Sequence, residues 1–215
     1  MTVIDLTHLI REGMPVYPGT EPPVLTPASS HDKDGYWETK ISMFSHTGTH
    51  IDSPAHIIKG AKRLDEFEVG HFVGKALVID CRDIPEGSEI GLYKISLYGK
   101  RAEEAEFLLF LTGWDKLWGS DDYFKGYPVL SREALDYVIS GGYKGIGFDT
   151  ISIDPSDDPG LPRHKRLFRE AEIINIENLT GLEALLDKEF ILSALPLKFE
   201  NSDGAPARAV AIIDQ

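Results

Sequence analysis

Residues 45–57 read SHTGTHIDSPAHI and contain three of the seven histidines of the chain together with one aspartate. Imidazole nitrogen and carboxylate oxygen are the ligands that Zn²⁺ and related divalent ions select in proteins. We therefore interpret His46, His50 and Asp52 as a metal site, with His56 beside it. The alternative is a polar turn whose histidines only form hydrogen bonds, and it explains one histidine more easily than four such groups close together.

The spacing of the four groups favours an extended chain over a helix. In a helix, Asp52 would point about 200° away from His50, whereas in an extended chain positions 46, 50, 52 and 56 share one side. Four residues of ideal strand nevertheless span about 13 Å, close to the furthest separation from which two imidazoles can bind one ion. We therefore expect the chain to bend at Gly48, which can bend without steric cost.

The composition is that of one globular domain over residues 1–215, with 42% hydrophobic and 27% charged residues. The chain has 22 basic and 35 acidic residues, and its net charge of −13 repels phosphate backbones and anionic membranes. We therefore expect a small-molecule partner, and neither nucleic acid nor a membrane.

Three features favour a cytoplasmic location. The single cysteine, Cys81, cannot form an internal disulfide, and the first ten residues lack the basic start and long apolar stretch of a signal peptide. The longest apolar stretch, residues 107–111, is much shorter than the ~20 residues that a membrane span requires.

The loop GMPVYPGTEPP follows a strand predicted over residues 3–10 and contains Tyr17. The flanking prolines stiffen the backbone, which suits a ring that packs on a ligand, although a ring that covers the core is equally compatible with the sequence. Residues 37–44 then alternate as WETKISMF, and we expect Trp37, Ile41 and Met43 to face the core.

The remaining sequence alternates strands with short helices, which predicts an α/β fold with a mixed sheet. A helix is expected from Ser131, its capping residue, to the glycines at 141 and 142. The other expected strands cover residues 75–81, 107–111, 144–148, 173–177, 190–195 and 208–213, and the other expected helices cover residues 163–172 and 178–186.

His164 and Glu177 are further candidate ligands, but neither is specific alone. A histidine in a basic helix is commonly solvated, and a glutamate before NLTGL could support the start of the next helix.

The cluster Asp154, Asp157 and Asp158 lacks the alternating spacing of a calcium loop, so we interpret it as turn chemistry. Trp114 and Trp118 fit the wall of an aromatic pocket and a core position equally well.

The segment HTGTHIDSPAH resembles the HxGTHxDxPxH signature of the cyclase-like metal hydrolase family, which includes bacterial kynurenine formamidases and isatin hydrolases. The resemblance continues through GMPVYPG, TGW, GFDTISIDP, ENLTGL and PLKFENSDGAPARAVAII. It implies a swivelling β/β/α arrangement of mixed sheets and an assembly into homodimers or homotetramers.

The resemblance also implies roles for matching residues. One or two divalent ions, Zn²⁺ or alternatively Mn²⁺, would be held by His46, His50, Asp52, His164 and Glu177, with Asp52 as the bridge. His56 matches the proton-transfer residue, and Tyr17 stands where formamidases commonly have a substrate-contacting tryptophan.

The implied reaction is hydrolysis of an arylformamide by metal-activated water, as in kynurenine formamidase of tryptophan catabolism, with His56 carrying the proton to the leaving amine. Two alternatives remain open on the sequence. The same site could open a cyclic amide or lactone, or the chain could be a metal-dependent binding protein in which His56 only forms a hydrogen bond.

Overall fold

A computed structural model describes residues 1–214 of the protein. Its main sheet has eight strands in the order β1-β12-β11-β5-β7-β9-β10-β4, and a further pairing joins β12 to β4. This pairing closes seven of the strands into a barrel-like ring. The strands are β1 (Thr2–Asp5), β4 (His50–Asp52), β5 (Val73–Asp80), β7 (Phe107–Leu111), β9 (Gly145–Phe148), β10 (Ile174–Glu177), β11 (Phe190–Pro196) and β12 (Gly204–Ile213).

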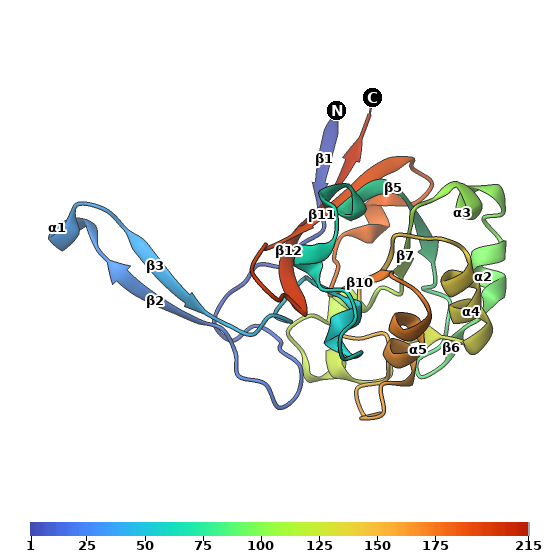
Figure 1. Cartoon of the computed structure of the whole chain (residues 1–215), viewed down its shortest axis with the longest axis horizontal. Helices are drawn as coiled ribbons and strands as arrows, with labels where there is room; N and C mark the ends of the chain where they lie inside the picture. The colour runs from blue at the N-terminus through green and yellow to red at the C-terminus, as the bar shows by residue number, and fades with distance from the viewer. Residues whose placement is uncertain (215) are drawn as a thin grey trace.

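The ring is mixed, as the sequence predicted. Strands β5, β7, β9 and β10 pair in parallel, whereas β4, β11 and β12 pair antiparallel with their neighbours. The strand predicted over residues 3–10 is shorter in the structure and ends at Asp5. β1 pairs with residues 210–213 of β12, whereas residues 204–206 of β12 pair with β4 instead. The two chain ends therefore lie side by side (Figure 1).

Side chains on the two faces of the central strands enter two cores. On β5, Ala76 and Val78 join a core formed by strands and loops, while Leu77 and Ile79 join a second core with the helices. All five residues of β7 are buried, as expected for a strand covered on both faces. The helices α2 (Leu92–Ser96), α3 (Lys100–Glu104), α4 (Arg132–Ser140) and α5 (Pro162–Glu170) gather on one side of the molecule (Figure 1).

Local sequence signals explain one helix well and another poorly. The hydroxyl of Ser131 accepts a hydrogen bond from the Ala134 N–H and caps α4, as predicted. The helix predicted over residues 178–186 is wrong, because only a short 3₁₀ turn forms at Leu182–Leu185. Asn178 and Gly181 adopt φ of +57° and +70°, which interrupt a right-handed helix.

A hairpin of β2 (Val24–Ser29) and β3 (Glu38–Ser42), with α1 (His31–Asp34) at its tip, projects far from the rest of the molecule (Figure 1). We call it the hairpin arm. The prediction that Trp37 and Ile41 face the core is wrong, since they are 57% and 54% exposed. In the part of the chain that the structure describes, β3 pairs only with β2, and all five of its residues are exposed.

Shorter elements complete the fold. A two-stranded parallel sheet joins β6 (Glu89–Ile90) to β8 (Val129–Leu130). The other 3₁₀ turns lie at Pro54–His56, Leu64–Glu66, Val69–Phe72, Trp114–Leu117 and Asp121–Phe124. Among residues 1–214, the helices are all too short or too polar to cross a membrane.

Candidate metal centre

The strand β4 carries two of the predicted ligands into the buried part of the ring. It pairs with β10 on one edge and with β12 on the other, so all three of its residues are buried. His50 and Asp52 share one face, and Ile51 points into the core on the other. Because Glu177 on β10 lies directly opposite His50, a third ligand group reaches the same face.

Gly48 brings His46 to this face. It adopts φ of +67°, which confirms the predicted bend. His46 Nδ1 then lies 2.6 Å from Asp52 Oδ1, and His50 Nε2 lies 3.2 Å from the same oxygen. The close approach of His46 also requires a glycine at position 204, because a Cβ there would lie 2.3 Å from the imidazole ring.

The helix α5 supplies the remaining predicted ligand from the opposite side. His164 Nε2 lies 3.5 Å from Asp52 Oδ2 and 3.3 Å from Glu177 Oε1. The two oxygens of Asp52 therefore face different partners, with Oδ1 near His46 and His50 and Oδ2 near His164.

The second ring nitrogen of each of these histidines is fixed. His50 Nδ1 donates to the Gly48 carbonyl at 2.8 Å, and His164 Nδ1 donates to Asp154 Oδ2 at 2.8 Å. His46 Nε2 donates to Asp203 Oδ2 at 3.0 Å. Metal-binding histidines typically donate their other N–H to a carbonyl or carboxylate, so all three rings fit a divalent ion.

Buried carboxylates give the site a strongly negative field. Burial alone would lower the pKa of His46, but hydrogen bonds with Asp203 and Asp52 raise it to about 10. For Asp52 the effects have the opposite sign. Burial alone would raise its pKa, but the charge of His50 and hydrogen bonds from the neighbouring imidazoles hold the pKa well below its usual value. His46 thus holds a proton that a bound cation would displace.

His56 lies beside this donor set in the turn after β4. Its ring centroid is 3.9 Å from that of His46, and its Nδ1 is 3.8 Å from Asp203 Oδ2. One nitrogen of His56 also lies within 4.8 Å of donor atoms of His46 and Asp52. Burial lowers the pKa of His56 to about 4, so its imidazole is neutral at pH 7 and can accept a proton.

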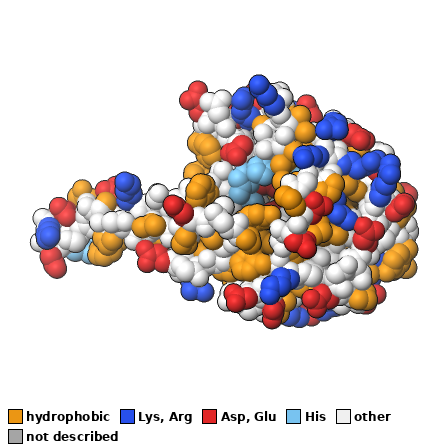
Figure 2. All heavy atoms as spheres, turned by 90° about the horizontal axis from the view of Figure 1, so that it is seen from below, with side chains coloured by type: hydrophobic (Ala, Val, Ile, Leu, Met, Phe, Trp, Pro, Cys, Tyr) orange, Lys and Arg blue, Asp and Glu red, His pale blue; other side chains and the backbone are white. Residues whose placement is uncertain are grey.

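A cavity of about 380 Å³ opens onto these groups. Figure 2 shows a patch of histidine side chains near the base of the hairpin arm, with apolar side chains around it. Tyr17, Phe44, Ile151 and Leu161 line the cavity. The structure thus brings Tyr17 to the predicted site, where its hydroxyl donates to the Ser156 carbonyl at 3.4 Å.

The structure places the two tryptophans whose role the sequence left open and the aspartate cluster that we interpreted as turn chemistry. Trp114 and Trp118 pack on a buried cluster with Tyr123 and Tyr127 and are not among the residues that line the cavity. Asp154 accepts hydrogen bonds from the backbone at the start of α5 and from His164, which confirms its role in the turn and adds support of a ligand.

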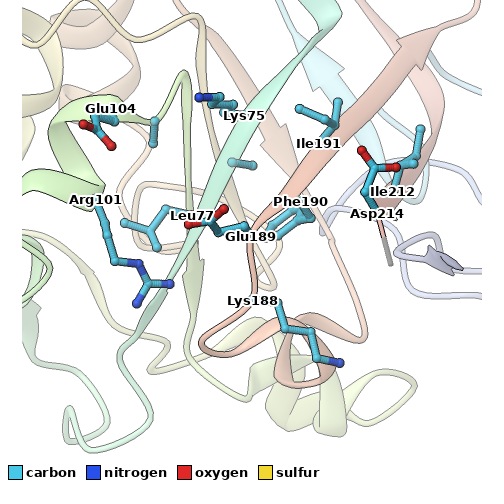
Figure 3. Close-up of a pocket in the computed structure, with 12 residues that line it drawn as sticks. Lys75, Leu77, Arg101, Glu104, Lys188, Glu189, Phe190, Ile191, Ile212 and Asp214 are labelled. Carbon is cyan, nitrogen blue, oxygen red and sulfur yellow. The ribbon is translucent and has the colours of Figure 1, made fainter. Parts of the chain in front are cut away.

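A second hollow, of about 290 Å³, lies between α3, β5 and β11 (Figure 3). Its charged side chains are of both signs and spread around the rim. Among the described residues, its lining has no histidine or cysteine, so it lacks the donor set of the first cavity. The charged residues of this second hollow are Lys75, Arg101, Glu104, Lys188, Glu189 and Asp214.

The sequence analysis missed Asp203, Asn175 and Asn178. Asp203 precedes Gly204, which pairs with Asp52, and local spacing gives no signal for a pairing over 150 residues. Asn175 had a signal, because it stands two residues before Glu177 in a predicted strand and so shares its face. Asn178 donates a hydrogen bond to the Gly48 carbonyl at 2.8 Å and so contacts the bend before β4.

Comparison with known proteins agrees with this geometry. Residues 4–155 match the family described as putative cyclase. The kynurenine formamidase of Bacillus cereus is 31% identical over 208 residues, covering 96% of this chain and 95% of the relative. That of Bacillus thuringiensis is 32% identical over 209 residues, with the same coverage.

Solved structures of similar proteins cover almost the whole chain. Isatin hydrolase A from Labrenzia aggregata has a TM-score of 0.89 and 27% identity, covering 100% of this chain and 94% of its own. A potential metal-dependent hydrolase with cyclase activity has a TM-score of 0.79 and 28% identity, covering 100% and 99%. Together with the imidazole and carboxylate groups above, these matches define a metal-dependent hydrolase. The chain belongs to the cyclase family, as the resemblance of residues 46–56 predicted.

Proposed function

We propose that this hydrolase cleaves an arylformamide, as the kynurenine formamidases do by their names. The observation that carries the proposal is the position of Asp52, whose two oxygens face two sets of ligand groups at the base of a cavity with aromatic walls. Identity of 31% over 96% of the chain with a kynurenine formamidase supports the choice of substrate.

We assign two ion positions to these groups: a first ion would be held by His46, His50 and Asp52, and a second by Asp52, His164 and Glu177. Glu177 also lies 3.6 Å from His50, and donor atoms of His50, Asp52 and Glu177 lie within 4.8 Å of one another, so the two positions are adjacent. The first position is rich in imidazole, which favours Zn²⁺. The second has two carboxylate oxygens, which also suit Mn²⁺.

The chemistry that a divalent ion would supply here is activation of water at neutral pH and polarisation of a carbonyl oxygen. In the reaction, the oxygen of water bonds to the formyl carbon and the C–N bond breaks, so the departing nitrogen must receive a proton. His56 is placed to carry this proton. Its Nδ1 faces Asp203, so Nε2 is the nitrogen that accepts a proton from the attacking water and delivers it to the amine.

The walls of the cavity favour an aromatic substrate. A volume of about 380 Å³ is within the usual range of small-ligand sites. Tyr17 and Phe44 offer ring surfaces at its entrance, and Tyr17 is held by its hydrogen bond to Ser156. We assign substrate binding to Tyr17, with its ring against the ring of the amide.

A cyclic amide is the second candidate substrate. Two isatin hydrolases superpose with TM-scores of 0.88 and 0.89 over 99% and 100% of this chain. The same residues would open such a ring, because hydrolysis of a cyclic amide also needs water activation and a proton for nitrogen. A binding protein without turnover is the third possibility, and absence of activity toward both substrate classes at full metal occupancy would favour it.

The proposal extends to assembly and location. We propose one domain over residues 1–215, of the swivelling β/β/α type, that forms homodimers or homotetramers in the cytoplasm. Cys81 is buried as a free thiol, which suits a reducing compartment. An isolated two-stranded hairpin is marginally stable in water, so the exposed Trp37 and Ile41 of the hairpin arm support contact with a second copy.

The experiment is a parallel assay of formanilide, N-formylkynurenine and isatin with metal-depleted protein that is reloaded with Zn²⁺ or Mn²⁺. We expect turnover of both formamides after reloading and slower turnover of isatin. Faster hydrolysis of isatin would instead make the cyclic amide the substrate class.

A further inference from the structure

Asn175 contacts both carboxylates of the proposed second ion position. It is fully buried on β10, where it pairs with Asp52 of β4 and lies two residues before Glu177 on the same face. Its Nδ2 donates to Asp52 Oδ2 at 2.9 Å and to Glu177 Oε1 at 2.8 Å. One neutral amide group therefore joins two anionic side chains from different strands.

The two acceptor oxygens are the same ones that face His164. His164 Nε2 lies 3.5 Å from Asp52 Oδ2 and 3.3 Å from Glu177 Oε1. A carboxylate oxygen has two lone pairs, so it can accept a hydrogen bond from Asn175 and still bind an ion with the other. Asn175 thus fixes the direction of the lone pairs that remain for a ligand.

Folding stability alone does not explain an amide at this position. The Oδ1 atom of Asn175 is buried and has no hydrogen-bond partner within residues 1–214. An unpaired buried carbonyl carries a desolvation cost. Ile174 and Ile176 enter the apolar core on the other face of β10, so Asn175 and Glu177 are the polar residues of the face toward the site. The two N–H groups, by contrast, match the two carboxylate oxygens.

We propose that Asn175 is a positioning residue that sets the affinity of the second ion position, formed by Asp52 Oδ2, His164 and Glu177. The inference rests on the proposed two-ion site. Without the two hydrogen bonds, both carboxylates lose a donor that stabilises their charge and their orientation, so the second ion binds more weakly. Within the described residues, Asn175 forms hydrogen bonds with Asp52 Oδ2 and Glu177 Oε1 and none with His46, His50 or Asp52 Oδ1, so the first position should change less.

The test replaces Asn175 by Leu, which has a similar size and no donor. Metal-depleted protein is titrated with Zn²⁺ in competition with a chromophoric chelator, which resolves the two binding steps. We expect the second step to weaken by about 10- to 100-fold, the usual effect of losing such a hydrogen-bond partner of a metal ligand, while the first step changes little.

A control and a second variant keep the test decisive. Lys40→Ala on the exposed strand β3 of the hairpin arm is the control, because Lys40 does not line the cavity. The affinity of this control for the second Zn²⁺ ion is expected to match that of the wild type. Asn175→Asp adds a third buried carboxylate, so the metal-free protein should melt at a lower temperature and gain more stability from Zn²⁺ than the wild type.

The outcomes separate the two proposals. If the wild type binds two ions and Asn175→Leu binds both with unchanged affinity, Asn175 does not position the ligands and this inference is wrong. An equal gain in melting temperature with Zn²⁺ for the wild type and Asn175→Asp would also overturn it. A wild type that binds only one ion would contradict the two-ion proposal itself, and the Asn175 inference with it.

Discussion

Strands β3 and β4 follow one another in the chain and differ completely in burial. All five residues of β3 are exposed, and all three residues of β4 are buried. The difference lies in their pairing, because β4 is enclosed between β10 and β12, whereas β3 in the described structure pairs with β2 alone. An alternating pattern therefore identifies residues that share a face, but long-range pairing decides whether that face is buried.

The comparison also concerns chemistry. The charged and imidazole groups of β4 are held at fixed distances by neighbours from two other strands, whereas Glu38 and Lys40 of β3 are in solvent. Changes on β4 and its neighbours should therefore affect metal binding and catalysis. Changes on β3 should leave both unaltered.

His50→Ala should have the largest effect. It removes one of the two imidazoles of the first ion position, which lies 3.2 Å from Asp52 and 3.6 Å from Glu177. We expect loss of the first ion and of formamide hydrolysis, measured by elemental analysis and assay of the same preparation. Lys40→Ala on β3 is the matched control and should retain both. Equal metal content in His50→Ala and the wild type would remove His50 from the ligand set.

His56→Asn should reduce turnover while it preserves metal. Asparagine keeps a hydrogen-bonding side chain but cannot transfer a proton near neutral pH, so kcat should fall by about 10² to 10⁴. The limb of the pH–rate profile that His56 produces should flatten. Parallel loss of metal and activity would instead make His56 a ligand, which its distance from His46 and Asp52 also allows.

Glu177→Gln should have a smaller effect on affinity. The amide keeps the size of the side chain but removes the negative charge, so the affinity of the second ion should fall by at least about tenfold. Competition with a chelator measures this change. If affinity and activity stay unchanged, Glu177 is not a ligand and serves to accept the hydrogen bonds from the Ile153 N–H and from Asn175.

Tyr17→Ala should change substrate preference more than chemistry. A stacked ring contributes about 0.5 to 1.5 kcal/mol beyond its burial, so KM for aromatic formamides should rise several-fold while kcat changes less. Tyr17→Phe keeps the ring and loses only the hydrogen bond to Ser156, so its KM should stay near that of the wild type. Equal kinetics of Tyr17→Ala on aromatic and aliphatic formamides would exclude contact with the substrate.

Ile41→Lys in the hairpin arm should have the smallest effect on the site. It places a charge in the exposed apolar face of β3, so the mass in solution should decrease toward that of a monomer. Light scattering after size-exclusion chromatography measures the mass, and elemental analysis should find unchanged metal content. An unchanged oligomer would exclude this face from the subunit contact.

The sequence was most informative where the interactions are local, although the helix predicted over residues 178–186 shows that local signals can also mislead. His46, His50 and Asp52 lie within seven residues, so their residue types, the bend at Gly48 and the extended backbone could be derived from spacing. The capped helix α4 and the mixed α/β fold were predicted for the same reason. His164 and Glu177 were identified through the family resemblance, because neither residue is specific alone.

Features that depend on distant pairing could not be derived in this way. Asp203 reaches His46 because β12 pairs with β4, and Asn175 reaches Asp52 because of the register between β4 and β10. The exposure of Trp37 and Ile41 likewise depends on β3 leaving the main sheet. Sequence spacing predicts which residues can share a face, but it does not contain the register that joins strands over 100 residues apart.

The central claim is that hydrolysis depends on ions held between β4, β10 and α5. The most direct measurement is the rate of formanilide hydrolysis by one preparation before chelation, after chelation and after addition of Zn²⁺ or Mn²⁺, with metal content determined at each stage. Activity should disappear with the metal and return as up to two ions bind per chain. Full activity in protein that elemental analysis finds free of metal would contradict the account.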